Sequence, residues 1–96
     1  MHSTLKALFP LGHIVATPGA LSALGDEGVT ADALLIRHVC GDWGDMTRED
    51  KDENALSLKE GFRIFSAYDL PRTGRTIWVI TESDRTATTL LLPDEY

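Results

Sequence analysis

The pattern of apolar and polar positions divides this chain into a helical first part and a strand-forming second part, with the change near residue 62. In the first part, apolar residues recur at helical spacing in three segments, which open at Thr17, Thr30 and Thr47. A threonine side chain caps the free N–H groups of a first helical turn. Proline at the first helical position and acidic residues in the first turn strengthen these starts, and glycines close each segment. The pattern predicts helices over residues 17–25, 30–41 and 47–60.

The second of these helices is expected to be buried on most of its circumference. Its apolar residues cover more than one stripe of the helical surface, which is typical of an enclosed helix. Arg37 and His38 are its polar exceptions.

After residue 62 the chain is rich in aromatic and β-branched residues, which favour strands. Three runs, over residues 62–70, 76–81 and 87–92, are separated by a PRTG turn and by a polar tip. They predict a three-stranded antiparallel meander. Its middle strand is apolar on both faces, so we expect helices on one face and further cover on the other. His13–Ala16 is a candidate edge strand, because a nearby proline is tolerated at a sheet edge.

The predicted fold is therefore α+β, with two to three N-terminal helices packed on a C-terminal meander. With 96 residues the chain corresponds to one domain, residues 1–96. The single cysteine excludes an internal disulfide and suits a reducing cytoplasm. We expect no signal peptide and no membrane crossing, because the apolar residues near residue 10 are interrupted and no apolar run is long enough to span a membrane.

Charge and motifs exclude several classes of function. The net charge of −6 argues against general binding to nucleic acid, which requires clustered lysine and arginine. The three histidines, His2, His13 and His38, lack the paired spacing of a metal site, so no metal is expected. No cofactor is expected either, because glycine-rich phosphate loops and nucleophile motifs are absent.

One candidate site lies at the end of the second predicted helix and comprises His38, Asp42 and Trp43. A histidine near a helix C-terminus gains from the dipole when protonated, and Asp42 is placed to orient it. In that interpretation His38 is a general acid or base, or part of a binding surface on which Trp43 stacks. The alternative is a plain helix end, with Trp43 folded over the core.

A second candidate site is the tip of the predicted hairpin, with Glu82, Asp84 and Arg85. A carboxylate and an arginine three residues apart, with His38 as a further candidate, supply a base and a cation for metal-free cleavage of RNA. The alternative is a polar turn in which Asp84 caps the loop and Arg85 pairs with Glu82 for little energy.

The motifs GDWG at 41–44, an acidic helix containing Asn54, and IWVITESDRTATTLLLP at 77–93 carry a family resemblance. They make the chain similar to small bacterial proteins borne on plasmids and integrated elements, often catalogued as plasmid-related or loosely as type I restriction subunit M. The resemblance implies an accessory role in a mobile element and carries no activity. A methyltransferase does not fit, because 96 residues cannot hold its cofactor-binding sheet.

A resemblance of layout alone links the chain to barnase-like and RelE-like ribonucleases, which also place helices before an antiparallel sheet. Those enzymes use a Glu, Arg and His set on the sheet, whereas no histidine follows residue 62 here.

Three functions follow as hypotheses. The leading one is a cytoplasmic accessory protein that binds another protein through the Trp43 loop, the acidic third helix or the hairpin tip. The second is a metal-independent ribonuclease or toxin-like enzyme that uses Glu82, Arg85 and His38. The third is an acidic decoy that inhibits a DNA-binding enzyme. The last strand, with Thr88 and Thr89, is also a plausible edge for a homodimer.

Overall fold

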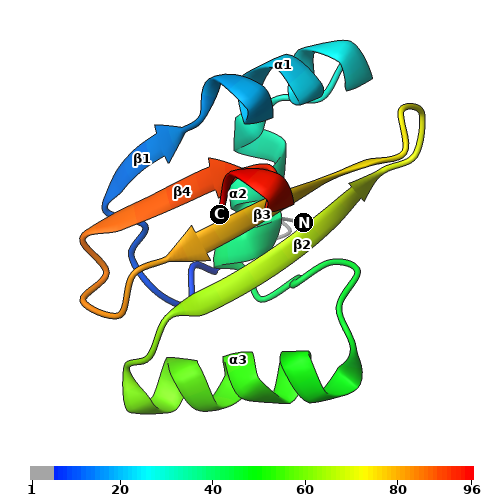
Figure 1. Ribbon diagram of the computed structural model, residues 1–96. Coiled ribbons are helices and arrows are strands. Elements are labelled where there is room, and N and C mark those ends of the chain that lie inside the picture. The colour runs from blue at the N-terminus through cyan, green and yellow to red at the C-terminus, as the bar shows by residue number, and fades with distance from the viewer. Residues whose placement is uncertain (1–5) are drawn as a thin grey trace, which may run out of the picture.

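The computed structural model describes residues 6–96, which form an α+β fold of three helices and a four-stranded mixed sheet (Figure 1). The elements in chain order are β1 (His13–Ala16), α1 (Pro18–Glu27), α2 (Ala31–Val39), α3 (Arg48–Glu60), β2 (Ile64–Leu70), β3 (Arg75–Thr81), β4 (Ala87–Leu91) and the short 3-10 helix η1 (Pro93–Glu95).

The sheet has the strand order β1-β4-β3-β2. The predicted antiparallel meander of β2, β3 and β4 is confirmed, with Ala67 opposite Trp78 and Trp78 opposite Leu91. The predicted edge strand is also confirmed, and β1 runs parallel to β4. The sheet is therefore mixed and four-stranded, because the three helices carry the chain across to β2 and the meander then returns to β1. The idea that the last strand is a free edge for dimerisation is wrong, since β4 lies inside the sheet.

The predicted threonine caps are confirmed. The side chains of Thr17, Thr30 and Thr47 each accept the backbone N–H three residues on. The predicted stop at Gly25 is wrong, because α1 continues to Glu27 and ends at Gly28, whose φ of 79° is left-handed. The extra turn buries the Glu27 side chain, whose carboxylate accepts the backbone N–H groups of Arg72 and Thr73 and so fixes the turn between β2 and β3.

The orientation of α2 also differs from the expectation. Its buried residues are Leu34, Leu35 and His38, whereas Ile36 is 48% exposed. The helix therefore buries one stripe at three- and four-residue spacing rather than most of its circumference. The polar exception His38 lies inside the protein, and the apolar Ile36 lies on its surface.

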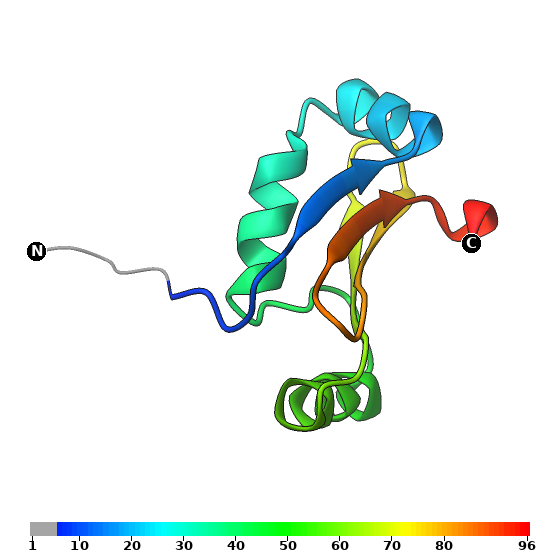
Figure 2. The ribbon, with the colours of Figure 1, turned by 90° about the vertical axis from the view of Figure 1, so that its left-hand side faces the viewer.

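The two faces of the sheet are covered to different extents. The face with Ile77 and Val79 packs against α1 and α2 in the main apolar core, and Figure 2 shows α2 against this face with η1 on the other side. The second face carries Phe65 and Trp78, which remain partly exposed. Its cover comes from Tyr96, whose ring lies 5.7 Å from that of Trp78, and from α3 at one end.

The loop between α2 and α3 runs beside the outer edge of β2. The N–H of Asp45 donates to Ala67, and the N–H of Ala67 donates to Trp43. Gly44 lies between them at φ 80°, where a Cβ atom would collide with the Ala67 carbonyl and the Tyr68 ring. Gly41, at the start of this loop, also has a positive φ, of 89°.

Candidate functional site

His38 is fully buried and lies beneath the end of the β3–β4 hairpin next to its tip, where Thr81 pairs with Thr88. Its Nδ1 atom lies 2.6 Å from Ser66 Oγ, and its Nε2 atom lies 2.9 Å from Thr81 Oγ1. Thr81 Oγ1 in turn lies 2.7 Å from Thr88 Oγ1, which donates to the carbonyl of Leu11. A continuous hydrogen-bonded chain therefore joins α2, three strands and the segment before β1.

The direction of this chain assigns the tautomer of His38. A hydroxyl has one proton to donate, and that of Thr88 goes to the Leu11 carbonyl. Thr81 must then donate to Thr88, so it accepts the Nε2–H of His38, and Nδ1 accepts from Ser66. Both ring nitrogens of a neutral imidazole are thus satisfied. Burial lowers the pKa of His38 to about 4, so the ring is uncharged near neutral pH.

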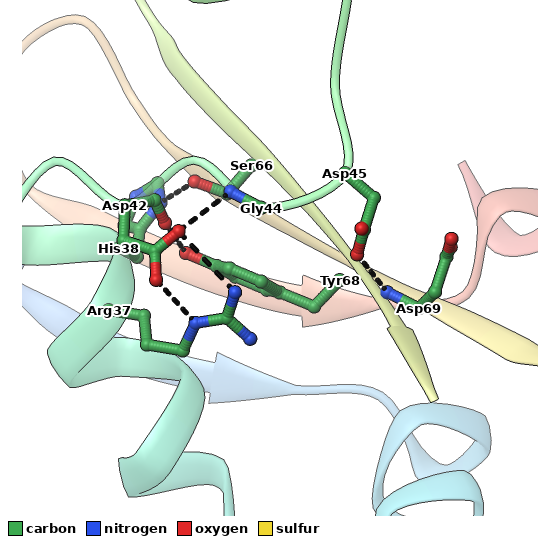
Figure 3. A network of polar contacts seen from close by, with 8 residues as sticks. All are labelled: Arg37, His38, Asp42, Gly44, Asp45, Ser66, Tyr68 and Asp69. Carbon is green, nitrogen blue, oxygen red and sulfur yellow. Dashed lines mark hydrogen bonds and ion pairs between the residues drawn. The ribbon is translucent and has the colours of Figure 1, made fainter. Parts of the chain in front are cut away.

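Asp42 does not orient His38. Its carboxylate accepts Arg37 Nε at 2.7 Å and the N–H of Gly44 at 3.2 Å (Figure 3). The hydrogen bond from Arg37 is the main reason that the pKa of Asp42 is lowered. The Arg37 guanidinium also lies over the ring of Tyr68, 4.4 Å from its centroid, and the Tyr68 hydroxyl donates to the Asp42 carbonyl. These contacts fix the loop against the sheet.

Trp43 is 8% exposed and packs with Phe9 and Ile64 in a second apolar cluster. Its ring stacks on Phe9, with the centroids 6.3 Å apart, and meets the edge of His38 at 5.9 Å. The tryptophan is therefore a core residue rather than an exposed stacking surface.

The guanidinium of Arg85 is bound to backbone carbonyls. Nη2 donates to Ser57, and Nη1 donates to Phe62, Glu82 and Ser83. Arg85 itself has a φ of 61°, which is rare for a residue other than glycine. Its side chain ties the hairpin tip to the end of α3.

The other two tip residues have simple surroundings. Asp84 accepts from the backbone N–H and hydroxyl of Thr86, and these bonds lower its pKa, as in an ordinary loop cap. The Glu82 side chain is half-buried. Glu82, Arg85 and His38 do not meet in a cleft: His38 is enclosed, Arg85 is bound to carbonyls, and none of the three lines a cavity described below.

A groove of about 490 Å³ lies between α3 and the second face of the sheet. Phe65, Ala67 and Trp78 line it from β2 and β3, and the two aromatic rings meet edge to face at 4.8 Å. We call this cavity the α3 groove. Its complete lining is Asp45, Met46, Thr47, Asp50, Glu53, Asn54, Ser57, Arg63, Phe65, Ala67 and Trp78.

Asn54 fixes the wall of the α3 groove. Its side-chain amide donates to the Phe65 carbonyl at 2.5 Å and accepts the Phe65 N–H at 3.0 Å. The helix is thereby bonded to the edge of β2 in the manner of another strand. This clamp places Asp50 and Glu53, which come from the same helix, beside the aromatic rings.

The charges of the α3 groove are unbalanced. Three exposed carboxylates, on Asp45, Asp50 and Glu53, line it together with one guanidinium, that of Arg63. Arg63 is already engaged, since its Nη2 donates to the Tyr96 hydroxyl at 2.7 Å. An apolar aromatic surface bordered by carboxylates suits a ligand that is both flat and cationic.

Sequence reasoning singled out the acidic third helix as one possible interaction surface but missed Asp45, Phe65 and Trp78. The available signal was the alternation in the strands, which places both aromatic rings on the face opposite α1 and α2. Which carboxylates would face those rings depends on how α3 returns to β2.

Comparisons of the chain with family models, with curated proteins and with solved structures find no match. Two further searches concern the described residues alone. None of the helices in residues 6–96 has the length and hydropathy that a membrane crossing requires. In the same range, His, Cys, Asp and Glu side chains do not come together in threes as metal ligands would.

Proposed function

We propose that the protein is a non-enzymatic binding protein that takes an arginine or lysine side chain of a partner protein into the α3 groove. The observation that carries this proposal is the meeting of exposed carboxylates with partly exposed aromatic rings in one cavity. The proposal narrows the protein-binding hypothesis from three candidate surfaces to one.

The chemistry of the α3 groove favours a guanidinium. A flat cation stacked on Trp78 or Phe65 gains about 0.5–2 kcal/mol from the ring quadrupole. Asp50 and Glu53 lie on the adjoining wall and supply acceptors for its N–H groups. Arginine offers five donors in a planar fork, so it satisfies both kinds of contact at once.

The same charges disfavour phosphates. A nucleic-acid backbone brought to the α3 groove would meet three carboxylates and one guanidinium that is already bonded to Tyr96. Binding to nucleic acid gains its energy from neutralising phosphates with cations. A basic segment of a protein fits better, and the net charge of −6 would draw it in.

The setting we propose for this activity is a plasmid or an integrated element. It rests on the resemblance of the GDWG loop, Asn54 and the segment 77–93 to proteins of such elements. In this chain the loop and Asn54 hold the edge of β2, and β2 and β3 supply the aromatic floor of the α3 groove.

The test is an NMR titration with an unstructured peptide that carries two arginines among glycine and serine residues. We expect shifts within residues 45–57, 63–67 and 78, the ranges that contain the lining of the α3 groove, and weaker binding as salt is raised. The same peptide with citrulline, which is nearly isosteric and uncharged, should bind much less. Equal binding of the two peptides, or shifts confined to other residues, would refute the proposal.

Asp50→Asn provides the matched variant, because both it and the control Glu49→Gln remove one carboxylate from the first turn of α3. Of these two residues, Asp50 lines the α3 groove and Glu49 does not. We expect Asp50→Asn to weaken the arginine peptide about threefold to tenfold, which corresponds to about 0.7–1.4 kcal/mol. Glu49→Gln should change the affinity by less than about twofold.

Trp78→Leu distinguishes binding in the α3 groove from the alternative function, that of an acidic decoy. A decoy acts through its field of charges, so the loss of an aromatic ring would leave its binding intact. In the α3 groove the ring is a direct contact, and its loss should weaken the arginine peptide as much as Asp50→Asn does.

A further inference from the structure

Within residues 6–96, nearly all outward backbone groups are hydrogen-bonded at one edge of the sheet, and those at the other edge are unpaired. Along β2, every second residue points its backbone groups outward, and five of these six groups, all but the Asp69 carbonyl, are hydrogen-bonded. Phe65 is bonded to the Asn54 amide, Ala67 to the 43–45 loop, and the N–H of Asp69 to the Asp45 carboxylate at 2.9 Å. This edge cannot accept another strand.

At the opposite edge, β1 has no strand on its outer side in the described residues. His13 donates its N–H to the carbonyl of Thr86, directly before β4, and Thr17 donates its N–H to Leu90 of β4. Because the direction alternates along a strand, Ile14 and Ala16 point their N–H and C=O groups away from the sheet. An unpaired edge of this kind is a template for one more strand.

The side chains beside this edge are apolar. Ile14 is 47% exposed and Val15 is 49% exposed. Ile14 also borders a shallow cavity of about 300 Å³ against Leu35, Ile36 and Val39 of α2. Asp32 is the one charged residue in the lining of that cavity. Natural edge strands are commonly protected by short length, lysine, proline or a bulge. The HIVA sequence of β1 is short, with four residues, but contains no lysine or proline.

The apolar character of the β1 edge, and its complementarity to itself, favour a second copy of the chain as the occupant. The chain carries −6, so two copies repel each other over most of their surface. The β1 edge is an apolar region where that repulsion is weakest, whereas the α3 groove is acidic and suits an unlike partner. A second β1 strand offers the same exposed isoleucine and valine and the same unpaired backbone groups, so the edge is complementary to itself.

We propose that the protein forms a two-fold symmetric dimer in which β1 pairs antiparallel with β1 of a second copy. With Ile14 opposite Ala16 of the other strand, the outward N–H and C=O groups of both residues bond across the axis. The two sheets become one of eight strands. Both α3 grooves stay accessible, because they adjoin β2 at the far edge of each sheet (Figure 1).

Sedimentation of the full chain over a dilution series tests this proposal. We expect a species of about 21 kDa, twice the 10.5 kDa of one chain. Ile14→Glu, which places two carboxylates near the axis, should raise the dissociation constant more than tenfold. Leu56→Glu is the matched control, since Leu56 is also 47% exposed but lies on α3, and it should leave the dimer unchanged.

Ile14→Pro gives a second, independent readout. It removes an N–H that points outward and none that β4 accepts, so it should abolish the dimer while the β1–β4 amides remain protected from hydrogen exchange. A monomer at every concentration of the wild-type chain would overturn the proposal. A dimer that survives both changes at Ile14 would overturn it too.

Discussion

The buried imidazole of His38 makes the stability of this protein depend on pH in a predictable way. In the folded state the pKa of His38 is about 4 because the ring is buried, whereas in the unfolded chain it is about 6.5. Between about pH 6.5 and pH 4, His38 binds a proton in the unfolded chain but stays neutral in the folded protein. The free energy of unfolding therefore falls as the pH is lowered from 6.5 towards 4.

The size of this effect follows from the two pKa values. A difference of one pKa unit is worth 1.36 kcal/mol, so the full loss below pH 4 is about 3 kcal/mol, and about 2 kcal/mol of it is already present at pH 5. That amount is a large share of the stability of a domain of this size. Protonation would also turn Nδ1 from an acceptor into a donor, so that the Ser66 hydroxyl would have to rotate to accept its proton.

Urea unfolding at pH 7.5, 6 and 5 measures this loss when the wild-type chain is compared with His38→Gln. The variant should be less stable at pH 7.5, because a glutamine cannot satisfy both Ser66 and Thr81. The variant has no imidazole at position 38, so its stability does not fall through protonation of that residue. The stability gap between the two proteins should therefore shrink by about 2 kcal/mol between pH 7.5 and 5.

A gap that stays constant over this range would refute the assignment of a buried, neutral His38. NMR of the wild-type imidazole is a second measurement that does not depend on the variant. It should show the Nε2–H tautomer and no titration above pH 5. A ring that titrates near 6.5 would contradict the hydrogen-bonded chain.

The remaining predictions concern the two side chains that tie α3 to the sheet. Arg85→Lys should lose about 1–3 kcal/mol of stability in urea unfolding, because an ammonium cannot reach the carbonyls of Ser57 and Phe62 together. A lysine variant as stable as the wild type would show that these bonds contribute nothing. Asn54→Asp keeps the acceptor for the Phe65 N–H but turns a carboxylate towards the Phe65 carbonyl. We expect a loss of about 2–4 kcal/mol at pH 7, partly recovered when the carboxyl is protonated at low pH, whereas an equal loss at both pH values would exclude this cause.

The local elements of the fold could be predicted from the sequence because their causes lie within a few residues. A threonine cap acts on an N–H three residues on, and alternation along a strand separates its two faces. All three helix starts and the three strands of the meander were accordingly predicted. The end of α1 was misplaced, because the turn that extends it past Gly25 is held by Glu27 against residues 72 and 73.

The candidate site was less predictable, since single residues changed their role once their surroundings were known. His38 was expected at the surface and lies in the core, whereas Ile36 was expected to be buried and lies at the surface. Trp43 follows the alternative in which it folds over the core. The pattern within α2 cannot decide this, because several stripes of the helix are apolar enough to be buried. The sheet against which it packs makes the choice.

The sequence alone determined the fold class, the caps, the turns and the alternation of the strands. The tertiary structure alone decided that β1 joins β4, that the 43–45 loop closes the edge of β2, and that the α3 groove unites three separate segments. The physical reason is the distance along the chain over which each interaction acts. Capping and periodicity act along the chain over a few residues, whereas strand order, burial and cavities depend on contacts between segments tens of residues apart.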